Sequence, residues 1–362
     1  MGLMISSNKI KAAPTILGLI YFLLGTLSSL SATDAYGNPY ELCPYKPAAP
    51  FVEPLYLVSK YDQSDPFKST VLNNHSLKKS KQIKNRIDQY VREVVNFSDI
   101  TLYSRSHKST ISNQCMHQWL DNWASNNALL TSKSSNTGKS VRTWTLASIT
   151  GALIKLERVN SHKASISPRT SQWLRSLAYQ VKEDYDYRLK TNYRYYNNHD
   201  HWAAWAVFSV GYLLNDSDLM LWGNKGFIKS IGLSKIIDEQ YAYFPIELSR
   251  KNKSLHYTHY SMTPLVMLDH YRRRAKYPEI SNESQFHKLV NFALDAALDQ
   301  DKFDELFVAN QDELRPHHLA WVIPYLSTHK DNSRAIALMD NYHGKIIGSS
   351  LLGGKIISVY LP

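Results

Sequence analysis

The sequence predicts an all-α protein, an incomplete (α/α) toroid of helical hairpins with a lid loop over a cleft at one end. Apolar residues recur at helical spacing from about Lys81 onward, and only the C-terminal tail has the pattern of a strand. The expected linkers are short, as in helical hairpins. No convincing internal repeat accompanies this pattern, and a superhelical solenoid is the structural alternative.

The elements can be assigned in chain order. Residues 36–56 are rich in Pro and Tyr and predict an extended arm. Apolar stripes from Ile83 to Val95 and from Met116 to Leu129 predict the first two helices. Lys355–Tyr360 is the one strand candidate. Further helices are expected at Val141–Leu156, Gln172–Tyr187, His201–Leu214, Asp216–Ile231, Pro264–Ala275, Ser284–Leu298, His317–Leu326 and Ser333–Tyr342.

A polar segment at about 59–80 interrupts the helical pattern. It carries Lys60, Lys68, Lys78 and Lys79 and few residues that can be buried. A polar loop of this length in a compact domain is usually a functional lid or disordered. Its positive charge favours a basic lid loop over an anionic cleft.

Residues 1–35 have the pattern of a secretory signal peptide that is cleaved. Lys9 and Lys11 precede the apolar run Ile16 to Leu30, and small residues follow from Ser31 to Ala35. The apolar run is shorter than the ~20 residues that a membrane-spanning helix needs. We therefore expect an exported protein whose mature part, 36–362, is a single domain with no membrane association after cleavage.

Export determines how the two cysteines are interpreted. Cys43 and Cys115 both lie in the mature part, and an oxidising compartment makes a disulfide between them the expected state. Two reduced, buried thiols are the alternative. Two cysteines are too few for a Cys-based zinc cluster.

The chain is basic, with 42 Lys and Arg against 31 Asp and Glu, and it contains 24 Tyr and 8 Trp. A basic surface favours a polyanionic partner. An exported protein without a nucleic-acid motif is not expected to bind nucleic acid. An anionic polysaccharide fits better, because Tyr and Trp stack on sugar faces and offer polar edges.

The segment Asn197-Asn198-His199-Asp200-His201-Trp202 predicts the start of a helix. Asn198 is a suitable N-cap, and Asp200 suits the positive end of the helix dipole. His199 then lies where backbone N–H groups favour a bound carboxylate and a neutral imidazole. The alternative is a capped core helix with one surface histidine.

Several collinear motifs together resemble the alginate lyase family, periplasmic poly-mannuronate lyases with an (α/α) toroid fold. They are Asn197-Asn198-His199-x-x-Trp202, Glu247-Leu248-x-Arg250 followed by Tyr257, Asn136-Thr137-Gly138-Lys139 with Arg142-x-Trp144, Ser59-Lys60-Tyr61, Gln311-Asp312 with Leu319-Ala320-Trp321, and Leu352-Gly353-Gly354. The resemblance covers nearly the whole mature chain.

The resemblance implies a periplasmic enzyme that cleaves poly-β-D-mannuronate by β-elimination. Asn198, His199 and Arg250 would neutralise the sugar carboxylate, which otherwise becomes a dianionic enolate. Tyr257 would act as base and acid, with its pKa lowered by Arg250. This chemistry needs no metal or cofactor, and we expect a monomer. The expected substrate-binding residues are Ser59, Lys60, Tyr61, Asn136, Thr137, Arg142, Trp144, His256 and Tyr260.

Two departures and three alternatives remain. His201 and His259 replace residues that are usual in the family, which puts the sugar preference in question. The substrate could be another uronan, such as glucuronan. A glycoside hydrolase on the same fold would need two carboxylates, and a non-catalytic polysaccharide-binding protein would need none. The carboxylates considered for hydrolysis are Asp238, Glu239 and Glu247.

Overall fold

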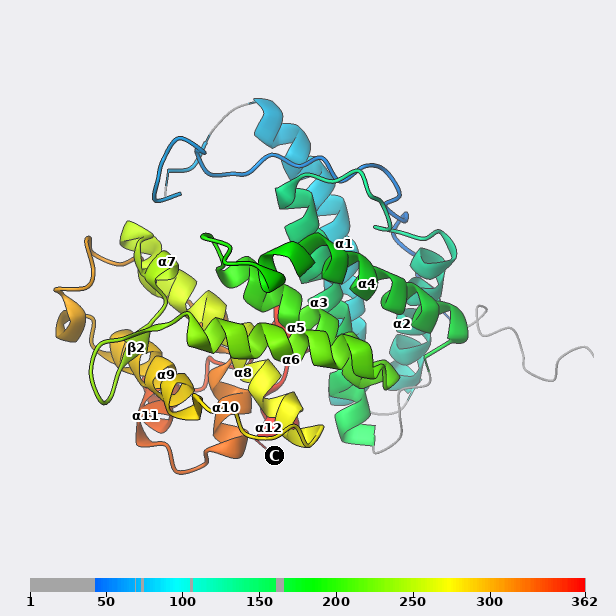
Figure 1. The fold of residues 1–362 in the computed structure, drawn as a ribbon. Coiled ribbons are helices and arrows are strands. Elements are labelled where there is room, and N and C mark those ends of the chain that lie inside the picture. Colours follow the sequence, from blue (N-terminus) through cyan, green and yellow to red (C-terminus); the bar gives the residue numbers. More distant parts are fainter. Residues whose placement is uncertain (1–42, 69, 73–74, 105–106, 161–165, 362) are drawn as a thin grey trace, which may run out of the picture. The chain divides into compact units, whose positions relative to one another are not determined.

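The computed structural model of the protein describes residues 43–361, apart from 69, 73–74, 105–106 and 161–165. The predicted signal peptide and the first residues of the predicted arm lie outside the described residues. The described chain is helical almost throughout, and successive helices pack against one another as the predicted (α/α) toroid of helical hairpins (Figure 1).

The α-helices are α1 (His75–Tyr103), α2 (His107–Ser125), α3 (Asn136–Asn160), α4 (Pro168–Lys190), α5 (Asn198–Leu214), α6 (Ser217–Gly232), α7 (Pro245–Leu248), α8 (Ser254–Arg274), α9 (Glu283–Leu298), α10 (Val322–Thr328), α11 (Ser333–Asn341) and α12 (Ile357–Tyr360). Short 3₁₀ turns lie at η2 (Lys251–Lys253), η3 (Asp301–Phe303), η4 (Pro316–Leu319) and η5 (Ser350–Leu352). The described strands form two antiparallel pairs, β1 (Lys235–Ile236) with β2 (Ala242–Tyr243) and β3 (Gly348–Ser349) with β4 (Gly354–Lys355).

Helix α5 lies at the centre of this arrangement (Figure 1). It packs against α3, α4, α6 and α8, and nearly all of its side chains are buried. Trp202 and Trp205 are fully buried in this core, so they stabilise the fold and are not sugar platforms. Gly223 of α6 lets the two helices approach closely, because a Cβ there would lie 2.6 Å from the carbonyl oxygen of Ala204. The central helix therefore holds its N-terminus in a fixed position.

The described part of the N-terminal arm is fastened to the helices at several points. The predicted disulfide joins Cys43 to Cys115 of α2. Further along, the backbone N–H of Leu129 donates to the carbonyl of Phe51 at 2.8 Å, and Leu55 pairs with the segment before α3. Gly138 of α3 is required at this crossing, because a Cβ would lie 1.9 Å from the carbonyl oxygen of Leu55.

Most predicted helices are present, but several boundaries were wrong. Helix α8 begins at Ser254, ten residues before the expected start at Pro264, which lies inside the helix. The expected strand Lys355–Tyr360 is wrong, since β4 ends at Lys355 and α12 occupies Ile357–Tyr360. The predicted lid segment is also shorter than 59–80, because α1 already begins at His75. Among the described residues, no helix has the length and apolar character needed to cross a membrane.

Candidate active site

The N-terminus of α5 is capped by Asn197 and not, as predicted, by Asn198. The side chain of Asn197 accepts from the backbone N–H of His199 at 3.0 Å. In the reciprocal bond of this capping box, the Asp200 carboxylate accepts from the backbone N–H of Asn197 at 2.8 Å. Asn198 is therefore the first helical residue, and its side chain is free to make other contacts.

Those contacts are with Glu247 of α7, which is fully buried. The backbone N–H of Asn198 donates to Oε1 of Glu247 at 2.7 Å, and its amide Nδ2 lies 3.1 and 3.0 Å from the two carboxylate oxygens. Burial raises the pKa of Glu247, while the hydrogen bonds from Asn198 and the charge of Arg250 oppose that shift. The acceptor at the start of α5 is thus a carboxyl group of the protein. This corrects the expectation that the backbone N–H groups here bind a sugar carboxylate.

His199 lies one residue further along α5 and contacts α3. Its Nδ1 is 2.8 Å from the hydroxyl of Ser140, and its ring stacks against Trp144 with the centroids 5.7 Å apart. Burial of the ring lowers the pKa of His199 to about 4, and the positive charges of Arg188 and Arg250 contribute to the same shift. The imidazole is therefore neutral at pH 7, as the sequence predicted.

Asp200 faces away from this ring and binds Arg188 of α4. Burial raises the pKa of Asp200 to about 6, although Arg188 and the backbone N–H of Asn197 oppose that shift. The ion pair ties α4 to the capping box, and thereby holds the first turn of α5 against α4.

Arg250 and Tyr257 form the second half of the cluster. The guanidinium carbon of Arg250 lies 3.9 Å from the centre of the Tyr257 ring, which is a close cation–π contact. Tyr257 is 9% exposed, and burial raises its pKa above the ordinary value despite the opposing effect of Arg250. The expectation that Arg250 lowers the pKa of Tyr257 below its usual range is therefore wrong for the structure as it stands.

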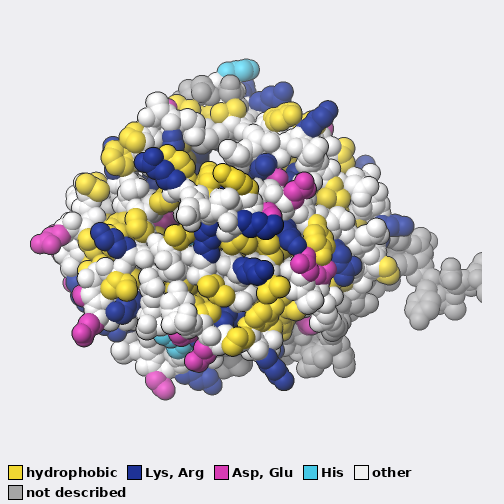
Figure 2. Space-filling view, in the orientation of Figure 1, with side chains coloured by type: hydrophobic (Ala, Val, Ile, Leu, Met, Phe, Trp, Pro, Cys, Tyr) yellow, Lys and Arg dark blue, Asp and Glu magenta, His cyan; other side chains and the backbone are white. Residues whose placement is uncertain are grey.

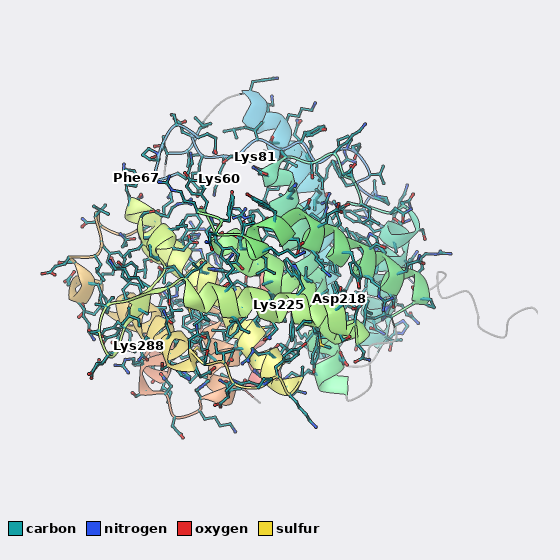
Figure 3. All side chains as sticks on the ribbon, viewed as in Figure 1. Lys60, Phe67, Lys81, Asp218, Lys225 and Lys288 are labelled. Carbon is teal, nitrogen blue, oxygen red and sulfur yellow. A yellow bond between two sulfur atoms is a disulfide. The ribbon has the colours of Figure 1, made fainter. Side chains whose placement is uncertain are left out.

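The lid loop covers these two residues. It is a hairpin in which the N–H of Leu72 donates to the carbonyl of Lys60 at 2.8 Å. The hydroxyl of Tyr257 donates to that of Tyr61 at 2.9 Å, and Arg250 donates to the carbonyl of Lys68 at 3.1 Å. Figure 3 shows Lys60 and Phe67 on this loop, beside α7. The lid therefore contacts both Arg250 and Tyr257.

His256 and Tyr260 complete the aromatic surroundings of Tyr257. The rings of His256 and Tyr260 are nearly parallel, 6.2 Å apart, and the ring of His318 lies 4.3 Å from that of His256. Burial lowers the pKa of His256 to about 4, and the charge of Lys60 contributes to the same shift. The structure thus brings the expected binding residues Lys60, Tyr61, Trp144, His256 and Tyr260 around the four expected catalytic residues.

Arg142 is not part of this cluster, and the prediction that it binds substrate is wrong. It is fully buried, with Nε donating to the carbonyl of Leu129 at 3.0 Å and a guanidinium nitrogen bound to Asp184 at 2.6 Å. Its guanidinium joins the loop before α3 to α4, so it has a structural role.

The start of α3, which carries the expected binding residues Asn136 and Thr137, lies against the N-terminal arm. The N–H of Gly138 donates to the hydroxyl of Ser135 at 3.1 Å, and the arm at Leu55 lies directly against this turn. Asn136 and Thr137 remain at the surface there, with no observed part in an anion site. The hydroxyl of Ser59 accepts from the N–H of Tyr61 at 3.1 Å and shapes the lid.

The two histidines that depart from the family pattern are core residues. His201 is 2% exposed, and its ring lies 4.9 Å from that of Phe244. His259 is fully buried and accepts a hydrogen bond from the indole of Trp321 at 3.1 Å. Neither side chain is placed to select a sugar directly.

Sequence reasoning missed Ser140, and it gave Glu247 a chemical role only in the hydrolase alternative, although Glu247-Leu248-x-Arg250 is one of the motifs of the resemblance. Ser140 lies one helical turn before Trp144, so its place on the face that meets His199 could have been inferred from the i, i+4 spacing. The contact of Glu247 with Asn198 spans 49 positions and has no local pattern. Asp238 is exposed in the β1–β2 turn, where it accepts from backbone N–H groups.

Lys and Arg side chains are spread over the face drawn in Figure 2, and several of them gather over α6. A surface groove of about 1000 Å³ along α4, lined by residues such as Arg175 and Tyr179, shares no residue with the cluster. We assign the site to the buried cluster because catalysis by electrostatic stabilisation requires enclosed, preorganised groups. Within the described ranges, no set of three or more His, Cys, Asp or Glu residues could hold a metal ion.

Comparisons with known proteins identify the family of the chain. Residues 57–303 match the sequence model of the family described as alginate lyase. The alginate lyase of Azotobacter vinelandii is 32% identical over 231 residues, which cover 62% of this chain and a little over half, 58%, of that enzyme. The alginate lyase of Pseudomonas fluorescens strain SBW25 is 27% identical over 386 aligned residues, covering 96% of this chain and 95% of that enzyme.

Solved structures show the same fold. Alginate lyase A1-III from Sphingomonas species A1 matches with a TM-score of 0.66 at 20% identity, covering 89% of this chain and 88% of that one. A variant of that enzyme complexed with a tetrasaccharide matches with a TM-score of 0.68 at 19% identity, covering 91% and 89%. The match to the sequence model of the family extends over more than half of this chain. The chain therefore belongs to the alginate lyase family.

Proposed function

We propose that this protein is a polysaccharide lyase that cleaves alginate by β-elimination, with poly-β-D-mannuronate as its preferred substrate. The observation that carries the proposal is the stacking of Arg250 on Tyr257 at 3.9 Å, beside Asn198 and His199 and beneath the lid. Family membership supports the reaction class. The products would be oligosaccharides with an unsaturated uronate at the non-reducing end.

The first requirement of the reaction is neutralisation of the uronate carboxylate. Removal of the C5 proton places a second negative charge on that group, and the resulting enolate needs preorganised positive partners. Arg250 supplies a permanent charge and a planar set of N–H donors, while His199 and Asn198 line the adjoining surface. One well-placed group of this kind is worth about 3–4 kcal/mol in the transition state.

The second requirement is a group that removes the C5 proton and protonates the departing O4. In mannuronate these two atoms lie on the same face of the sugar, so one residue can serve both steps. Tyr257 is the candidate, and it must first lose its own proton. In the structure its hydroxyl donates to that of Tyr61, which is partly exposed.

The lid supplies the third requirement, the exclusion of water from the site. Tyr61 and Lys68 contact the catalytic pair, and Lys251 lies 4.3 Å from the centre of the Phe67 ring. Lys60 is exposed on the same hairpin and is free to meet polymer carboxylates. We propose that lid closure over the chain of sugars completes the site.

The test is a product assay on a panel of purified uronans, namely poly-mannuronate, poly-guluronate, acetylated alginate and glucuronan. A lyase creates a conjugated unsaturated uronate, which absorbs in the ultraviolet, and a hydrolase creates none. We expect the fastest absorbance increase on poly-mannuronate. Release of reducing ends without ultraviolet absorbance would identify a hydrolase, and faster cleavage of glucuronan would reassign the substrate.

We further propose that the protein acts in the periplasm as a monomer, after loss of residues 1–35. Mass spectrometry of protein from a periplasmic extract should find a new N-terminus between Ser31 and Ala35. An intact N-terminus would contradict the proposed export.

A further inference from the structure

The hydroxyl of Ser140 determines which nitrogen of His199 carries the proton. Its oxygen lies 3.0 Å from the carbonyl oxygen of Asn136, 2.8 Å from Nδ1 of His199 and 3.5 Å from the hydroxyl of Tyr185. A carbonyl only accepts, so the single proton of Ser140 is donated to Asn136. The Ser140 oxygen must then accept from Nδ1–H. Neutral His199 therefore has a bare lone pair on Nε2.

Glu247 orients the side-chain amide of Asn198, as Ser140 determines the tautomer of His199. Both carboxyl oxygens of Glu247 accept from the NH₂ group of the Asn198 amide, at 3.1 and 3.0 Å, which leaves the carbonyl oxygen Oδ1 on the other side. That oxygen is buried and has no hydrogen-bond partner among the described residues. An unpaired buried acceptor costs about 1–3 kcal/mol, which indicates that a donor arrives with the ligand.

Both residues that border Arg250 thus offer acceptor atoms at a place where an anion must bind. A carboxylate cannot donate to a bare Nε2, and the Glu247 carboxyl supplies no positive charge nearby. Arg250 alone supplies one positive charge, whereas the enolate carries two negative charges. To balance both negative charges of the enolate, the site needs one more positive charge, which a proton on His199 would supply.

We propose that a uronate enters this site together with one proton from solvent, which binds Nε2 of His199 and is shared with the sugar carboxylate. Ser140 and Glu247 are positioning residues for this step, because they orient His199 and Asn198. The imidazolium and Arg250 then face the two negative charges of the enolate. The Asn198 oxygen accepts from a sugar hydroxyl. The inference rests on the proposed uronate substrate.

The groups around His199 determine whether Nε2 is protonated before and after the uronate binds. Burial and two guanidinium groups keep Nε2 free of a proton before binding, with a pKa of about 4. A carboxylate against Nε2 acts in the opposite direction, because an opposite charge favours the charged form. The ionisable groups around it are Tyr185 and Arg188 on α4, Asp200 and His201 on α5, Lys229 on α6, Glu247 and Arg250 at α7, and Tyr257 and Tyr260 on α8.

The experiment is calorimetric titration of the Tyr257→Phe protein with a mannuronate tetramer near pH 7, in buffers with different enthalpies of ionisation. We expect uptake of about one proton per bound tetramer and an affinity that weakens about tenfold per pH unit above neutrality. Binding without proton uptake would overturn the inference and leave the proposed substrate intact. Failure to bind any oligouronate would instead overturn the proposed function.

Variants in the same background assign the proton. His199→Gln should bind the tetramer without proton uptake, while His256→Gln, a matched histidine in the same cluster, should retain the uptake. Ser140→Ala should reduce the uptake below one, because a histidine without that acceptor can present Nε2–H. Full uptake in His199→Gln would place the proton elsewhere and refute the assignment, and full uptake in Ser140→Ala would refute the positioning role.

Discussion

Tyr257→Phe, paired with Tyr61→Phe, isolates the proton-transfer role of Tyr257 from its structural role. Both variants lose the same hydrogen bond, the 2.9 Å contact between the two hydroxyls, and both keep an aromatic ring in place. A neutral hydrogen bond contributes about 0.5–1.5 kcal/mol, so its loss alone should change kcat by about tenfold at most. Loss of a general acid and base costs about 10²–10⁴-fold.

The assay is the initial rate of ultraviolet product formation on poly-mannuronate at saturating substrate. Tyr257→Phe should lower kcat by more than about 100-fold with oligosaccharide binding retained, while Tyr61→Phe should lower it by about tenfold or less. An aromatic ring stays beneath the Arg250 guanidinium in both variants, so ground-state packing is comparable. Equal losses in the two variants would refute the reasoning, because the shared hydrogen bond would then account for both.

Three further outcomes are expected. Replacing Cys43 and Cys115 by Ala should lower the free energy of unfolding by about 4 kcal/mol, measured by urea denaturation, because the closed loop is long; an unchanged midpoint would contradict this. Arg142→Ala should destabilise the fold by about 3 kcal/mol or more, since it removes the buried ion pair with Asp184 and the donor to the carbonyls of Leu129 and Thr131; a variant with normal stability and a raised KM would restore its binding role. Lys60→Ala should raise KM on long polymer with little change in thermal stability; unchanged kinetics would show that the loop is a solvated surface segment without a part in substrate binding.

The fold was largely predictable because most helices bury a stripe of apolar side chains. The prediction failed where that stripe is absent. The first ten residues of α8 include His256, Tyr257 and Tyr260, which face the site, so the helical pattern became visible only from Pro264. The short hairpin β1–β2 and helix α12 are too brief for any periodic signal.

The site was predictable only as a set of residue types. Asn198, His199, Arg250 and Tyr257 were identified by resemblance, and the structure gathers them as expected. The sequence could not distinguish a buried structural cation such as Arg142 from a cation facing substrate. Nor could it show the direction of each hydrogen bond, which depends on contacts between distant segments.

Glu247 shows how such a contact decides between two functions. A glycoside hydrolase needs one carboxyl group to donate a proton and a second to act as base or nucleophile. Glu247 is fully buried and accepts from the backbone and side-chain N–H groups of Asn198, so its oxygens face the protein. Asp238 and Glu239 are exposed in the β1–β2 turn and are not part of the cluster. The three carboxylates therefore do not form the pair that hydrolysis needs, because Glu247 is buried and the other two are exposed outside the cluster. Arg250 and Tyr257, the neutralising and proton-transferring groups of an elimination, lie in direct contact.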